Sequence, residues 1–349
     1  MSSYSTHSLA TPLAALDLGG VRTSTNLILS PMSGVTDCAF RRLVKSCSGD
    51  AVGLLVSEFV AAEGLTRDNR KTLDMLRYDE SERPISIQIF GADVDRMVRA
   101  AAMVEDVGAD IVDINCGCPA PKVVKRGGGA QLMRTPDRLR DILRGVREAV
   151  GIPMTVKVRS GWDDDCLNAQ EIARLAEDEG AAMLAVHGRT RIQLYTGDAD
   201  WSLVKRLRAN LSIPVVGSGD ILSAADAMER LSAGSADGVM IGRGAMGNPW
   251  IFAQVRALAE GRPIPIPTPA ERVAALERFK NYLEEAASER SFHGRFRGFA
   301  CRMVKGSPGS AVARRRIGAA SDCNEVLAIF SDFILNAPLH AGEAATAVA

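Results

Sequence analysis

Several polar side chains in this sequence of 349 residues lie within short apolar segments or at their ends. Their types could support acid–base chemistry or ligand binding. Gln88, Lys157 and His187 are three of them. Burying a polar group is costly unless it finds a partner. A ligand with delocalised negative charge would suit the Lys157 ammonium, and the alternative is an ion pair with Asp113 or Glu58. A single Gln or His could be a satisfied core residue, but the three together favour a site.

Two cysteines follow another apolar segment, directly after an asparagine. Asn115, Cys116 and Cys118 open a stretch of about twenty residues before the next expected helix, and loops of that length are usually functional or disordered. A thiol with an ordinary pKa of about 8.5 is mostly protonated at neutral pH, so a cysteine above a strand end can donate a proton. A Cys-x-Cys pair could be half of a metal site, but no second Cys or His pair has suitable spacing, and we expect no metal.

Two glycine-containing loops follow the last two apolar segments. They read 217-GSGD-220 and 242-GRG-244. Glycine lets backbone N–H groups approach a phosphate closely, although either loop alone could be a tight turn. Their paired position favours a phosphate site.

The elements that would position these residues form a repeating pattern. Eight short apolar, β-branched segments begin at residues 27, 54, 84, 110, 153, 182, 213 and 237, with amphipathic stretches of helical period between them. This spacing is typical of βα units, and eight such units predict a (β/α)8 barrel, or TIM barrel, of the α/β class. A doubly wound sheet would more often have five or six strands and a GxGxxG turn after the first. In a barrel the chemistry lies at the carboxyl ends of the strands, where the polar residues fall, and the last two loops form the usual phosphate site.

The chain after the barrel has a different pattern. Prolines alternate along 261-GRPIPIPTP-269, as in a stiff linker, and Thr268, Pro269 and Glu271 predict a capped helix start. From there the pattern is helical to about residue 337, which predicts a small C-terminal helical domain. The expected organisation is an N-terminal leader 1–26, a barrel 27–260, a linker 261–269, a helical domain 270–337 and a flexible tail 338–349.

Composition limits the possible classes of protein. The sequence has 42 basic and 42 acidic side chains, which excludes the overall basic field of a bulk nucleic-acid binder. Its seven scattered cysteines contain no CxxC pair, as expected of reduced thiols, and there is neither a signal-peptide pattern nor an apolar stretch of 18 residues. We expect a cytoplasmic monomer without membrane contact.

Seven motifs within residues 27–250 resemble the bacterial branch of the flavin-dependent tRNA-dihydrouridine synthases. They are 29-LSPMSGVTD-37, 86-SIQIFG-91, 113-DINCGCPAPKV-123, 156-VKVRSGW-162, 186-VHGRTRIQLYTGDADW-201, 217-GSGDI-221 and 241-IGRGAMGNPW-250. The long motif at 186–201 is very specific. The family often has alanine where Ser33 stands and asparagine where Ser218 stands, and its aromatic-rich stretch in the helical domain is here 298-GFACRMVKGSPGSAVARRR-316.

The resemblance implies NADPH-dependent or NADH-dependent reduction of the 5,6 double bond of uridines in tRNA. It further implies that Asn115 orients the uracil and that Cys118 is the general acid, with Cys116 at a variable position. One FMN would lie at the barrel mouth. Its implied contacts are Pro31, Met32, Ser33, Gln88, Lys157, His187, Ser218, Gly219, Asp220, Gly242 and Arg243.

A basic segment in the helical part is the candidate surface for tRNA. Residues 291–316 contain seven basic and no acidic side chains, a local charge of 7 − 0 = +7. Such an excess suits RNA phosphates, and the alternative is a solvated helix face balanced by neighbouring segments. The seven are Arg295, Arg297, Arg302, Lys305, Arg314, Arg315 and Arg316. Arg191 and Gln193, beyond the sixth strand, could also contact RNA.

Two other functions fit the same residues. One is a flavin barrel that reduces a free pyrimidine or an enone, in which the basic helical segment is incidental. The other is a tRNA-binding folding factor with a structural flavin. The intact set of Cys118, Asn115 and Lys157 argues against the second.

Overall fold

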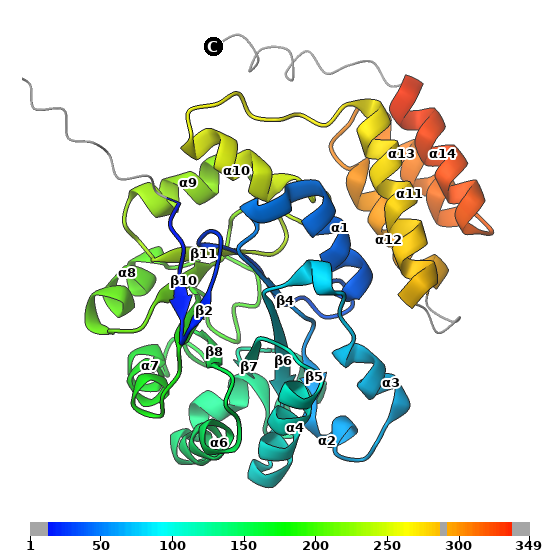
Figure 1. The fold of residues 1–349 in the computed structure, drawn as a ribbon. Helices are drawn as coiled ribbons and strands as arrows, with labels where there is room; N and C mark the ends of the chain where they lie inside the picture. The colour runs from blue at the N-terminus through cyan, green and yellow to red at the C-terminus, as the bar shows by residue number, and fades with distance from the viewer. Residues whose placement is uncertain (1–12, 287–291, 337–349) are drawn as a thin grey trace, which may run out of the picture.

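Eight parallel strands close into a barrel in the computed structural model, which describes residues 13–286 and 292–336 (Figure 1). Each strand pairs with the next along the chain, and pairing of the first with the eighth closes the sheet. The strands are β3 (Leu27–Leu29), β4 (Leu54–Val56), β6 (Ile85–Phe90), β7 (Ile111–Cys116), β8 (Met154–Arg159), β9 (Met183–His187), β10 (Val215–Ser218) and β11 (Gly238–Ile241). The predicted (β/α)8 barrel is confirmed.

Helices surround the barrel because alternate residues of each strand point outward and are apolar. In β7, Val112, Ile114 and Cys116 pack against the helices, while Asp113 and Asn115 face the barrel axis. Asp or Ser side chains cap four of the helices. The helices are α1 (Cys38–Ser48), α2 (Ala62–Leu65), α3 (Arg70–Leu73), α4 (Val94–Asp106), α6 (Pro136–Ala149), α7 (Ala169–Asp178), α8 (Trp201–Asn210), α9 (Ala224–Ser232) and α10 (Ile251–Ala259). The short strand β5 (Val60–Ala61) pairs in parallel with the carboxyl end of β6.

The stretch after β7 differs from the expected irregular loop. It contains α5 (Pro121–Val124) and a 3₁₀ helix, Gly129–Arg134. Single turns of this kind are too short to show a helical period in the sequence. The stretch therefore has more regular structure than predicted, and it still rises directly from the strand that carries Asn115.

The floor of the barrel is closed by residues that the sequence pattern assigns to a leader. β1 (Asp17–Leu18) and β2 (Val21–Arg22) form an antiparallel ribbon whose turn contains Gly19, with φ of +67°, against Pro153. Leu18 is fully buried and joins an apolar cluster inside the barrel. Two-residue strands give no alternation to detect, which is why the ribbon was not predicted. Residues 1–12 of the expected leader and the expected tail 338–349 lie outside the described residues.

The C-terminal helices pack beside the barrel against α1 (Figure 1). Phe40 of α1 makes edge contacts with two phenylalanines of these helices, so one apolar core runs through both parts. The predicted cap is present, because Thr268 and Glu271 exchange hydrogen bonds. The helices are α11 (Pro269–Ala286), α12 (Phe292–Met303), α13 (Ser310–Ala319) and α14 (Cys323–Asn336).

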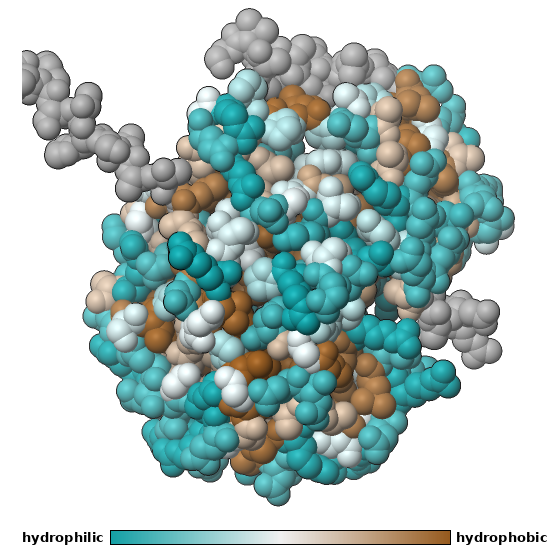
Figure 2. All heavy atoms as spheres, viewed as in Figure 1, coloured by the Kyte–Doolittle hydropathy of each residue, from teal (hydrophilic) through white to brown (hydrophobic). Residues whose placement is uncertain are grey.

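The surface seen in Figure 2 is mostly hydrophilic, with hydrophobic residues in small separate groups. Within the described ranges, no helix is long and apolar enough to cross a membrane.

Candidate active site

The inside of the barrel changes from apolar to polar towards the carboxyl ends of the strands. β8 shows the change, because Thr155, Lys157 and Arg159 occupy alternate positions and share the inner face. Above them is a cavity of about 450 Å³ at the barrel mouth. The residues expected at the site that line it are Pro31, Met32, Ser33, Asn115, Cys118, Lys157, His187, Ser218, Gly219, Asp220, Gly242 and Arg243.

Gln88 is not among the lining residues and lies behind them. Its Nε2 donates a hydrogen bond to Asp113 Oδ2 at 2.5 Å, and its Oε1 accepts one from Asn115 Nδ2 at 2.7 Å. Asp113 also accepts a hydrogen bond from Thr155 Oγ1. Gln88 therefore orients Asn115 in a buried polar chain and does not face the cavity itself.

Lys157 makes no hydrogen bond or ion pair with any described residue. The two alternative partners are engaged elsewhere, since Asp113 binds Gln88 and Thr155, while Glu58 accepts the Gly34 N–H. Burial, with a contribution from nearby Arg159, lowers the pKa of Lys157 to about 8. The ammonium is thus available to an anionic or electron-rich ligand in the cavity.

His187 is held in its neutral form. Burial, together with the surrounding Lys157, Arg159 and Arg189 charges, lowers its pKa to about 2. A neutral imidazole has one donor and one acceptor nitrogen, so His187 can orient a polar ligand without adding a charge.

The two cysteines of the loop after β7 lie in different environments. Asn115 Oδ1 accepts the backbone N–H of Cys118 at 2.9 Å, and this turn brings the Cys118 side chain to the cavity. Cys116 is fully buried in the core between strands and helices. Burial raises the pKa of the Cys118 thiol, so it remains protonated at neutral pH and can act as an acid.

The two glycine loops bring backbone and an arginine to the cavity edge. Gly219 has φ of +122°, and a Cβ there would lie 2.6 Å from Ala199 Cβ, so the close approach requires glycine. The Asp220 carboxylate accepts hydrogen bonds from Arg189 and from Arg243, the latter at 2.9 Å. Asp220 therefore positions the Arg243 guanidinium, and its own negatively charged carboxylate would repel a phosphate rather than bind it.

Several residues that line the cavity were not expected from the sequence, among them Arg159, Tyr195 and Phe59. Arg159 is buried and donates hydrogen bonds to the carbonyls of Gly117 and Thr190. Its position two residues after Lys157 on one strand predicts the same inner face, so the signal was present. Tyr195, under the Arg243 guanidinium, and Phe59 lie in loops that have no such pattern.

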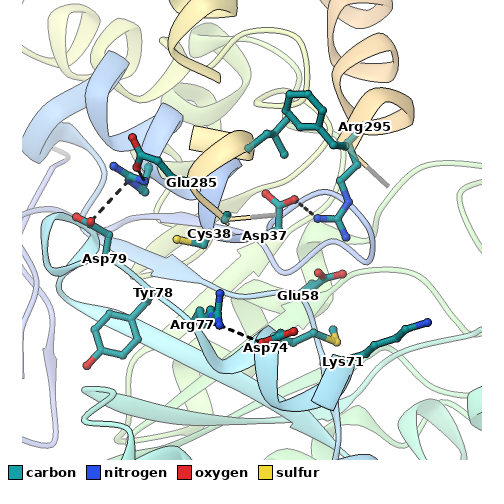
Figure 3. A pocket seen from close by; sticks show the side chains of 15 residues that line it. Asp37, Cys38, Glu58, Lys71, Asp74, Arg77, Tyr78, Asp79, Glu285 and Arg295 are labelled. Carbon is teal, nitrogen blue, oxygen red and sulfur yellow. Dashed lines mark hydrogen bonds and ion pairs between the residues drawn. The ribbon is translucent and has the colours of Figure 1, made fainter. Parts of the chain in front are cut away.

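The basic residues expected to bind RNA differ in what they contact. Arg295 forms an ion pair with Asp37 at 2.6 Å, in a cleft between α1, the segment after β4 and the C-terminal helices (Figure 3). Arg297 donates to a backbone carbonyl, and Arg191 stacks on Trp162. Lys305 is exposed, as are Arg302 and Arg314 to Arg316. The cleft, of about 640 Å³, is lined by four basic and five acidic side chains, so its charge is nearly balanced.

A closed barrel with a protonated thiol, an unpaired ammonium and a neutral imidazole at its mouth has the architecture of a TIM-barrel enzyme. No cluster of three or more potential metal ligands occurs in the described part of the chain.

Comparison with known proteins identifies the family. The model of the dihydrouridine synthase (Dus) family matches residues 28–337, so the chain belongs to this family. A probable tRNA-dihydrouridine synthase of Rhodobacter capsulatus is 45% identical over 251 residues, covering 72% of this chain and 76% of that protein. tRNA-dihydrouridine synthase B of Xanthomonas axonopodis pv. citri is 43% identical over 254 residues, covering 72% and 76%.

A solved structure of a 2-naphthoyl-CoA reductase complex shares the fold. Its TM-score is 0.54 at 14% sequence identity, and the match covers 71% of this chain and 52% of the reductase chain. At this identity the likeness concerns the fold alone.

Proposed function

We propose that the protein reduces the 5,6 double bond of specific uridines in tRNA to 5,6-dihydrouridine, with bound FMN as cofactor and NADPH or NADH as reductant. Membership of the dihydrouridine synthase family and the names of its relatives support the reaction. The observation that carries the proposal is the cavity itself, which is lined by both the protonated Cys118 thiol and the unpaired Lys157 ammonium.

The cavity fits FMN in the chemistry of its lining. Lys157 would bind the electron-rich edge of the ring system, and the backbone at Pro31–Ser33 would form one wall. Gly219, Gly242 and Arg243 would hold the phosphate, where backbone and guanidinium donors converge without a side chain at either glycine. When bound, FMN supplies the hydride for the uracil ring.

The remaining chemistry belongs to side chains of the protein. Cys118 Sγ would donate a proton to uracil C5 and be reloaded from solvent through the mouth. The side-chain Oδ1 of Asn115 accepts the Cys118 N–H, and its Nδ2 donates to Gln88. Held in this way, Asn115 would orient the uracil beside that thiol. General acid catalysis of this kind contributes roughly 10²–10⁴ in rate.

A uridine within folded RNA can reach Cys118 only if its base is swung out of the stack. Enzymes that modify bases commonly use this route, which costs a few kcal/mol of unstacking. The cavity at the barrel mouth provides the receiving pocket.

Two measurements test the proposal. The purified protein should be yellow and release FMN on denaturation, and tRNA from a deletion strain should lack dihydrouridine at defined positions. Release of FAD, or no flavin after reconstitution, would overturn the cofactor assignment. Unchanged dihydrouridine in the deletion strain, with turnover of free uracil by the protein, would identify the free-pyrimidine reductase instead.

A further inference from the structure

The loops around the barrel mouth carry unequal charge. The segment after β7, residues 117–134, has four basic side chains and no acidic one. The neighbouring segment after β8, residues 160–168, has Asp163, Asp164 and Asp165 and no basic side chain. The two segments therefore differ in charge. Among the described residues, the only cations placed against the acidic segment by a ring contact are Arg134 and Arg191, which stack on Trp162.

The basic side lies next to the proposed acid. Cys118 is followed by three residues that line the cavity, and α5 begins at the last of them, Pro121. Lys122, Lys125 and Arg126 are exposed, Arg126 by 77% of its side chain. These three cations, the α5 cluster, are thus only a few residues from the thiol.

The α5 cluster continues towards the C-terminal helices. Glu63 of α2 forms ion pairs with both Arg126 and Arg67, at 3.2 and 3.0 Å, which joins α5 to the α2–α3 segment. In that segment Arg67, Arg70 and Lys71 outnumber Glu63 and Asp68. Lys71 in turn lines the same cleft as Arg295 (Figure 3). Basic side chains, interspersed with Glu63 and Asp68, therefore run from this cleft towards the cavity mouth.

We propose that the RNA strand carrying the target uridine crosses the mouth on the β7 side, with its phosphates on Lys122, Lys125 and Arg126. This inference rests on the proposed function, because it concerns how that substrate is seated. A base swung into the cavity leaves its own and neighbouring phosphates at the rim, where the nearest cations bind them. The three aspartates after β8 repel the same backbone, so the RNA leaves the mouth on the basic side.

The test compares matched triple variants that each remove three positive charges. In one, Lys122, Lys125 and Arg126 are changed to Gln; in the control, Arg174, Lys205 and Arg206 on the outer faces of α7 and α8 are changed to Gln. Binding of an unmodified tRNA transcript is measured from 50 to 200 mM salt. Each lost phosphate contact lowers the slope of log K against log salt by about 0.7 for single-stranded RNA.

We expect the α5 triple to bind tRNA at least tenfold more weakly at low salt, with a slope lower by about 2, and the control to stay within twofold of wild type. A Lys122→Gln, Lys125→Gln double variant keeps the Arg126–Glu63 pair, and we expect it to lose a lesser share of the affinity. Thermal melting and FMN content of each variant show whether it is folded.

A fourth variant, with Asp163, Asp164 and Asp165 changed to Asn, locates the strand. We expect a gain in affinity of less than threefold, because only a distant repulsion is removed when RNA does not lie over these residues. A folded α5 triple that binds like wild type, or a larger effect of the aspartate variant, would overturn the inference. Failure of the wild-type protein to bind tRNA at all would instead refute the proposed function.

Discussion

The cavity wall and the C-terminal helices both carry basic side chains, but they use them differently. In the cavity, Lys157 is enclosed by the barrel and has no partner among the described residues. On the helices, Arg295 is 39% exposed and binds Asp37 of the barrel. An enclosed cation without a partner indicates a ligand, whereas the exposure of a cation does not identify its role until its contacts are known.

The contacts distinguish a cavity cation, which indicates a ligand, from a surface cation that attaches the helices to the barrel. Asp37 caps α1 through its Oδ1 and binds Arg295 through its Oδ2, so part of the basic segment attaches the helices to the barrel. Arg302, Lys305 and Arg314 to Arg316 are exposed in the same part of the chain. These five are the members accessible to RNA phosphates, and the role that the sequence suggested for all seven stays a prediction.

The largest effect should come from the cavity thiol. Cys118→Ala should retain FMN but lose dihydrouridine formation by roughly 10²–10⁴, because the proton donor is gone. Cys116→Ala is the control, since that side chain is in the outer core, and its activity should stay near wild type. Single-turnover assays on tRNA measure both. An active Cys118→Ala beside a dead Cys116→Ala would show that the wrong thiol has been assigned.

A smaller effect is expected from the exposed basic residues. Changing Arg314, Arg315 and Arg316 together to Glu should weaken tRNA binding by about tenfold or more and flatten its salt dependence, since phosphate contacts release counterions. FMN content should be unchanged. Filter binding at several salt concentrations measures the result, and wild-type affinity throughout would show that these residues are only solvated surface.

The Lys157 ammonium makes the cavity sensitive to pH. Its pKa of about 8 means that the charge is present below pH 8 and is lost above it, so FMN affinity of the apoprotein should fall as the pH rises from 7 to 9.5. Lys157→Met should bind FMN roughly tenfold to a hundredfold more weakly at pH 7, because a charged hydrogen bond is worth about 1.5–3 kcal/mol. Flavin titration measures both, and a Lys157→Met variant with the same pH profile as wild type would contradict the assignment.

The smallest effect should come from the pair that joins the two parts. Arg295→Gln should lower the free energy of unfolding by at most about 1 kcal/mol, because the pair is partly exposed. Asp37→Asn preserves the cap, and a double-mutant cycle in urea isolates the pair. If Arg295→Gln instead weakened tRNA binding as much as the triple Glu variant, Arg295 would bind RNA directly.

The strands could be predicted because each is largely buried and therefore mostly apolar, with polar side chains near the carboxyl ends of several. Elements too short for any period, such as β1, β2 and α5, could not be. Within the site, a cation in an apolar strand identified Lys157, and loop position identified Cys118. The sequence could not show that Gln88 bonds to Asn115, or that Asp220 binds Arg243, because both depend on strand register and on the conformation of each side chain.

The ribbon at the floor of the barrel limits how ligands can reach the cavity. Leu16 and Leu18 join Ile28, Val216 and other apolar side chains to fill the axis below the polar residues. A ligand that reaches Lys157 or Cys118 must therefore enter and leave through the barrel mouth. Under the proposed function, a dinucleotide and a tRNA compete for the barrel mouth, so the dinucleotide must dissociate before the RNA base can enter. Under the same proposal, the closed floor would therefore make reaction with the dinucleotide and reaction with the uridine alternate.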